Sequence, residues 1–114
     1  MRKQLIENAA FDVATQVRAV EDAIESALAE IAELQGRMVH CRSVAGIATA
    51  TGHEAFEHLA RATLGLVGVR GRVADCHGVL METKQLIPGL RATGFGEGDE
   101  CPPPSGIQPL RVVA

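Results

Sequence analysis

Apolar or small residues recur at alternating intervals of three and four from Ala10 to Ala48 without a break. With one preceding position, the series is Ile6, Ala10, Val13, Val17, Val20, Ile24, Ala27, Ile31, Leu34, Met38, Cys41, Ala45 and Ala48. This is the a/d spacing of heptad repeats, which places an apolar seam along one side of an α-helix. Such a seam needs a second helix to cover it, so the chain must contain helices that pack along their length. We expect the first helix over about 6–48.

The stretch Thr49–His53 interrupts this pattern, and a second series with the same spacing follows it. Its members are Ala55, Leu59, Ala62, Leu66, Val69, Val73, Cys76, Leu80, Thr83 and Ile87. Thr51 and Glu54 have the spacing of a capping box, in which both side chains bind the first free amides of a helix. Pro88 and Gly89 favour a helix end. We therefore expect a second helix over about 52–88.

Two long helices joined by a few residues must be antiparallel neighbours. The sequence thus predicts an all-α fold, a long antiparallel helical hairpin over residues 1–88. At 1.5 Å per residue each helix would be roughly 55–60 Å long. A chain of 114 residues is one domain, but a single hairpin has a thin core.

Each predicted helix carries a second stripe of small and apolar residues, away from the seam and near the connection. Four glycines, Gly65, Gly68, Gly71 and Gly78, lie within the second helix, where each costs about 1 kcal/mol relative to alanine. Close approach between helices would offset this cost. We expect two hairpins to dimerise through these stripes into a four-helix bundle. The alternative is a monomer in which the glycines break the second helix. The interface residues expected for the dimer are Ala32, Gly36, Val39, Leu64, Val67, Gly71, Ala74, Gly78 and Met81.

Residues 89–114 form a Gly/Pro-rich, acidic and irregular tail, with three consecutive prolines from Pro102 and a short apolar end. Two roles fit this composition. The apolar residues Ile107, Leu110 and Val112 could anchor the tail on its own hairpin, or another protein could capture the tail as a docking peptide.

The best candidates for metal-binding or redox chemistry are His40, Cys41, Cys76 and His77, with Cys101 in the tail. Thiolates and imidazoles are zinc and copper ligands. Their spacing matches no known zinc motif, and a simple hairpin separates Cys41 from Cys76 by about 20 Å. Both cysteines occupy seam positions, where free cysteine behaves as a small buried hydrophobe. We therefore expect core packing, with no metal and no other cofactor, and keep a metal- or redox-responsive regulator as the alternative.

Other charged groups need no special chemistry. His53, Glu54, Glu57 and His58 cluster at the start of the second helix, where we expect them to be solvated. The first helix is acidic and the second more basic, which indicates charge complementarity between neighbouring helices. With a net charge of −3 and no tryptophan or tyrosine, the chain does not resemble a nucleic-acid binder. We expect no nucleic-acid partner.

The apolar residues are interrupted too often to predict a membrane span, and the N-terminus lacks the apolar segment of an export signal. Three cysteines without such a signal favour reduced thiols in the cytoplasm. The seam offers almost no polar groups for catalysis. The sequence therefore predicts a small, non-enzymatic, cytoplasmic interaction or scaffolding protein that self-associates through apolar helix faces.

Overall fold

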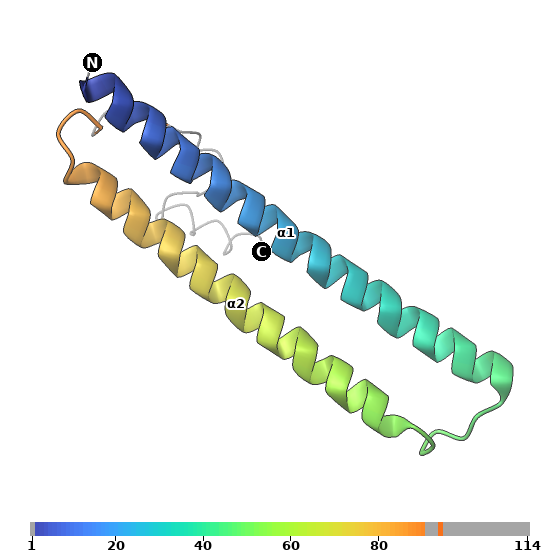
Figure 1. Ribbon diagram of the computed structural model, residues 1–114. Coiled ribbons are helices and arrows are strands. Elements are labelled where there is room, and N and C mark those ends of the chain that lie inside the picture. Colours follow the sequence, from blue (N-terminus) through green and yellow to red (C-terminus); the bar gives the residue numbers. More distant parts are fainter. Residues whose placement is uncertain (1, 91–93, 95–114) are drawn as a thin grey trace, which may run out of the picture.

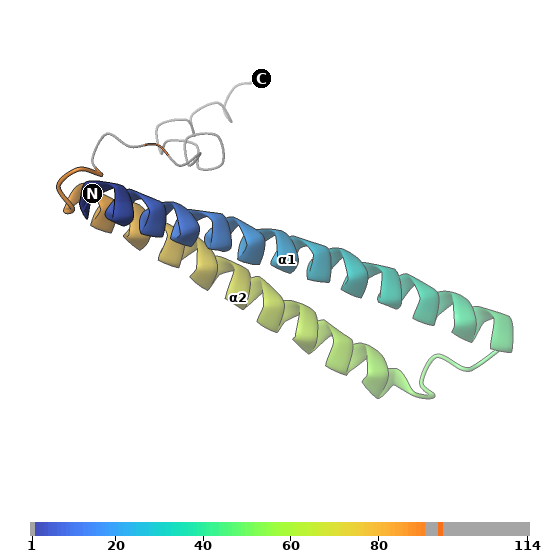
Figure 2. The same ribbon diagram turned by 45° about the horizontal axis from the view of Figure 1, so that its top comes forward.

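The computed structural model describes residues 2–90 and 94, which form two long helices joined by a short connection (Figure 1). Helix α1 spans Arg2–Ala45 and helix α2 spans His53–Gln85. The two helices run antiparallel, side by side, in both views (Figure 2). The prediction of an all-α antiparallel hairpin is confirmed. Residues 95–114, with the predicted anchors Ile107, Leu110 and Val112, lie outside the described part of the chain.

Helix α1 ends three residues before the predicted position because Gly46 provides a left-handed cap. Gly46 has φ of +67°, a conformation that glycine adopts without steric cost. Its N–H donates to the Ser43 carbonyl (3.2 Å), and the Ile47 N–H donates to the Arg42 carbonyl (3.1 Å). These two bonds make a Schellman motif, which satisfies the last free carbonyls of the helix. Because the apolar periodicity continues through Ala48, it does not reveal that the helix ends at Ala45.

Helix α2 begins without the predicted capping box. Its N-cap is Gly52, with φ of +73°, and no side chain caps the first turn. The prediction that Thr51 and Glu54 form the cap is therefore wrong. Because the chain turns through a left-handed glycine, the N-cap lies one residue later than the box requires. Glu54 still lies in the first turn, where its charge complements the helix dipole.

Helix α2 runs unbroken through its four glycines to Gln85. This excludes the alternative in which the glycines divide the helix. The helix ends before Pro88, and the chain then turns so that the Leu90 N–H donates to the Ile87 carbonyl (3.1 Å). Pro88 and Gly89, with φ of +94° at the glycine, suit the central positions of a type II turn. This turn directs Leu90, only 2% exposed, back onto the hairpin.

The hairpin uses only half of each predicted seam. One set of predicted positions does face the neighbouring helix. We call it the inner rows: Ala10, Val17, Ile24, Ile31 and Met38 on α1, Leu59, Leu66 and Val73 on α2, and Ile87 just beyond the end of α2.

For the other half of the seam, the residues in contact with the neighbouring helix lie one position after the predicted residues. Of the ten positions immediately after these predicted ones, eight are half-buried or buried, such as Glu21 in place of Val20 and His77 in place of Cys76, and Gln35 and Arg70 are exposed. We call the displaced set the outer rows: Val13, Val20, Ala27, Leu34 and Cys41 on α1, and Ala55, Ala62, Val69, Cys76 and Thr83 on α2. Of these ten residues only Ala27 is half-buried, and the other nine are exposed.

Candidate interaction surface

Polar contacts join the helices where the shifted rows face one another. Nδ1 of His77 lies 2.9 Å from Oε2 of Glu21. Because an ionised carboxylate only accepts, the imidazole N–H donates this hydrogen bond. His77 is 8% exposed, so the bond satisfies a polar group that is buried between the helices. This contact replaces the cysteine packing that the seam predicted at this level.

One turn away, the guanidinium of Arg70 on α2 contacts the carboxylate of Glu25 on α1. The hydrogen bond and the charge of Glu25 both raise the pKa of Arg70. Both side chains are more than half exposed, so solvent screens the pair. At this position the expected charge complementarity between an acidic α1 and a more basic α2 is present.

A third polar contact closes the connection between the helices. Nη2 of Arg42 donates to the carbonyls of Ala48 (2.7 Å) and Thr49 (3.2 Å). The same guanidinium lies over the ring of Phe56, 5.6 Å from its centroid, which is within cation–π range. One side chain of α1 thus holds both the connection and the first turns of α2.

The candidate metal ligands are not brought together. Glu21 and His77 lie at the same level of the hairpin, and Cys41 lies 20 residues beyond Glu21 along α1 (41 − 21 = 20). At 1.5 Å per residue, His40 and Cys41 are therefore about 30 Å from Cys76 and His77. Within residues 2–90, no three His, Cys, Asp or Glu side chains are close enough to hold a metal ion. Cys101 lies outside the described residues.

Both cysteines of the helices are free and exposed. The prediction that Cys41 and Cys76 are buried within the hairpin is therefore wrong for the single chain. The physical reason is the one-residue shift, which turns both cysteines out of the contact and turns Arg42 and His77 into it. The cluster of His53, Glu54, Glu57 and His58 is exposed, as expected.

The two outer rows lie on the same side of the hairpin. On α1 each outer-row residue follows an inner-row residue by three positions, and Ala62, Val69 and Cys76 do so on α2; three positions are a rotation of about 60° backwards around the helix at 3.6 residues per turn. Since the helices are antiparallel, an equal rotation from the line of contact turns both rows toward one face. We call this the outer face. Its large apolar side chains include Val13 (49% exposed), Leu34 (49%) and Val69 (48%).

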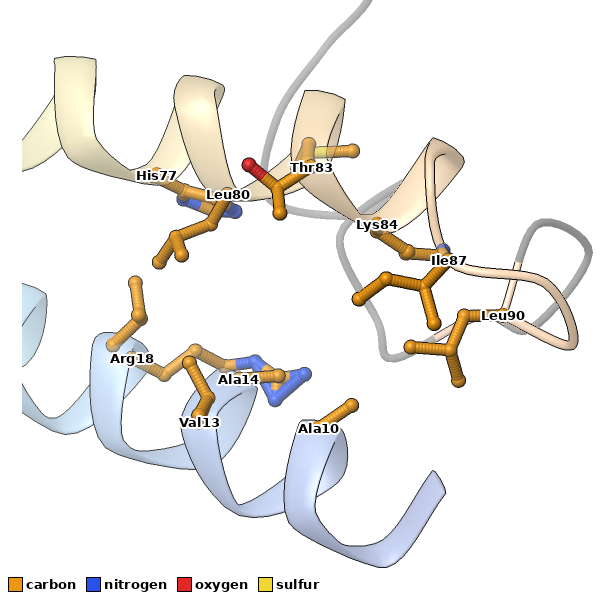
Figure 3. Close-up of a pocket in the computed structure, with 12 residues that line it drawn as sticks. Ala10, Val13, Ala14, Arg18, His77, Leu80, Thr83, Lys84, Ile87 and Leu90 are labelled. Carbon is orange, nitrogen blue, oxygen red and sulfur yellow. The ribbon is translucent and has the colours of Figure 1, made fainter. Parts of the chain in front are cut away.

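A groove of about 200 Å³ opens between the two helices near their free ends (Figure 3). Val13 and Thr83 of the outer rows both line it, so the groove continues the outer face into the contact between the helices. Its other walls are mainly apolar, and Leu90 closes one end. The helices therefore leave apolar surface exposed even along their line of contact.

The stripe of small residues expected to form the dimer interface is also uncovered. Gly36, Gly71 and Gly78 have no atom within 4 Å of the position that a Cβ would occupy, so each faces open space. Leu64 is 71% exposed and Val67 is 49% exposed, and Met81 is half-buried. The single chain leaves this stripe free for a partner, and its use in a dimer stays a prediction.

Sequence reasoning missed the outer face because it assigned these residues to the contact within the hairpin. The available signal was a charged or histidine residue directly after five of the ten outer-row positions: Glu21, Arg42, Arg70, His77 and Lys84. Glu21 and His77 are also nearly equidistant from the connection, which is the register that an antiparallel pair needs.

Comparison of the chain with protein-family models, with curated proteins and with solved structures finds no match. Neither α1 nor α2 contains a stretch that is long and apolar enough to cross a membrane. The geometry of the hairpin therefore carries the functional argument alone.

Proposed function

We propose that this chain is a non-enzymatic interaction protein that assembles with itself, two hairpins forming a four-helix bundle. The observation that carries this proposal is that the hairpin buries very few apolar side chains. Among the described residues, the buried apolar side chains are Ile24 and Leu90 alone. A hairpin of 44 and 33 helical residues with so little burial needs a further apolar surface to offset the loss of chain entropy.

The charged groups of the hairpin support a non-enzymatic role. Glu21 and His77 bind each other, and Glu25 and Arg70 bind each other across the helices. These pairs link the two helices, and among the described residues no three His, Cys, Asp or Glu side chains gather into a group that could hold a metal ion. A cytoplasmic location accords with this proposal, because exposed thiols such as Cys41 and Cys76 stay reduced there.

Sedimentation equilibrium of the full chain tests the proposal. We expect a mass of about twice 12.0 kDa at micromolar concentration, falling toward one chain on dilution. The mass should be the same with a chelator or a reductant present. A protein that remains a monomer up to about 100 μM, a concentration that reveals even weak association, would contradict it. A dimer that dissociates on chelation or reduction would instead favour a metal- or redox-responsive regulator.

A further inference from the structure

We propose that the second copy docks on the outer face, and not on the stripe of small residues. This inference rests on the proposed self-association and specifies which surface carries it. The occupant is another hairpin of the same chain, seated along the outer rows of both helices.

The outer face has the composition of a protein interior. Its ten positions hold four large or medium aliphatic residues, three alanines, two cysteines and a threonine, with no charged residue. Such a row extends along nearly the full length of both helices. Exposed apolar surfaces of this size are rare on monomers and mark interaction sites.

The area of the face matches the requirement of a stable dimer. Val13 and Cys41 are 28 residues apart on α1 (41 − 13 = 28), which is about 42 Å along the helix. Two adjacent helices are about 20 Å wide, which makes the face about 800 Å². Stable protein interfaces bury about 800 Å² on each partner. A second hairpin of equal length would therefore cover the face completely.

The stripe of small residues does not continue into the first half of α1, where charged residues take its place. On α1 its members Ala32 and Val39 each follow an inner-row residue by one position. Glu25 and Arg18 occupy the same relation to the inner row in the first half of the helix. Glu25 also holds Arg70 of α2 on that side of the hairpin. A partner that covered this side would bury an ion pair, which costs desolvation energy that the outer face does not demand.

Docking on the outer face also accounts for the cysteines. Cys41 and Cys76 both belong to the outer rows, and both are exposed in the single chain. A second copy on this face would bury them as small hydrophobes, which is the environment that free cysteine most often has. Thiol reactivity is therefore a direct readout of the proposed interface.

Two substitutions on α2 form a matched test. Val69 lies in the outer row and Val67 in the stripe of small residues, two positions apart, with exposures of 48% and 49%. Glutamate at either position adds the same charge to the same helix. In sedimentation equilibrium of the full chain, we expect Val69→Glu to raise the dimer dissociation constant by at least about 100-fold, because it buries an unpaired carboxylate. Val67→Glu should change it by less than about threefold, an effect expected of a surface charge.

The outcomes separate this inference from the proposed function. If Val67→Glu dissociates the dimer and Val69→Glu does not, the outer face is wrong and self-association stands. If both or neither dissociate it, the choice of the outer face is also overturned. A wild-type chain that is always monomeric overturns both proposals.

A second measurement avoids any loss of folding in the glutamate variants. In Cys101→Ser, only Cys41 and Cys76 remain to react with a maleimide. We expect both to react at least about tenfold more slowly at protein concentrations where the dimer forms than after dilution, as burial predicts. Equal rates in dimer and monomer would overturn the inference.

Discussion

Replacing Arg42 with alanine should loosen the connection between the helices. The guanidinium binds two carbonyls of the connection, Ala48 and Thr49, and lies over the ring of Phe56. Since all of these contacts come from one side chain, a single substitution removes them together. The helices themselves make no other described side-chain hydrogen bond to the connection.

The expected loss of stability in Arg42→Ala is estimated from the contacts that the guanidinium makes. An exposed hydrogen bond contributes about 0.5–1.5 kcal/mol net, and an exposed cation–π contact about 0.5–1 kcal/mol. The longer bond, 3.2 Å to Thr49, contributes at the low end. We expect Arg42→Ala to lower the free energy of unfolding by about 2 kcal/mol.

Arg37 provides the matched control on the same helix. Its side chain is 78% exposed, and within residues 2–90 it pairs only with Glu33, one turn earlier on α1. Such pairs contribute about 0.3–0.5 kcal/mol, so Arg37→Ala should have little effect. Arg42→Lys should lie between the two, because an ammonium keeps the cation–π contact but lacks the planar fork that reaches two carbonyls. Urea unfolding followed by circular dichroism at 222 nm, at one fixed protein concentration, measures all three variants.

The comparison between the two arginines decides the result. If Arg42→Ala and Arg37→Ala unfold at the same urea concentration, the contacts of Arg42 do not hold the connection. If Arg42→Lys retains full stability, charge alone is sufficient and the two-carbonyl bridge contributes nothing.

Four further substitutions, one of them a control, test the packing of the core, the N-cap of α2 and a glycine within α2. Ile24→Ala, at a site 7% exposed, should destabilise the protein by about 2–4 kcal/mol in the same urea assay, while Val44→Ala, 74% exposed, should stay within about 0.5 kcal/mol. Gly52→Ala should cost about 1–2 kcal/mol, because its φ of +73° strains any residue with a Cβ; a neutral result would contradict the left-handed N-cap. Gly71→Ala should stabilise α2 by about 0.5–1 kcal/mol, since its Cβ would meet open space. A weaker dimer in Gly71→Ala would instead indicate that the stripe of small residues packs closely against a partner.

The sequence was sufficient to predict two helices, their antiparallel arrangement and the inner rows. These follow from periodicity, which is an average over many residues and tolerates local errors. The helix ends were less predictable because they depend on single glycines. Gly46 and Gly52 stop and start the helices through positive φ, a property that an apolar pattern does not record.

The rotation of the helices could not be predicted from hydrophobicity alone. At several levels of the hairpin the residue in contact is more polar than the neighbour it displaces: Glu21 displaces Val20, and His77 displaces Cys76. Cross-helix hydrogen bonding favours this arrangement, since Glu21 meets His77 there. The hydrophobic pattern of a single helix contains no information about hydrogen bonds that its side chains make to another helix.

This rotation bears on how many neighbours each helix needs. A helix with one neighbour requires two rows of every heptad, whereas a helix inside a bundle requires about three. Both helices here have three rows suited to contact: the inner row, the shifted row that carries Glu21 and His77, and the outer row. The hairpin occupies the first two on each helix and leaves the third exposed. The apolar stripe is therefore one row wider than the hairpin can use, and a second hairpin on the outer face would supply the missing neighbour.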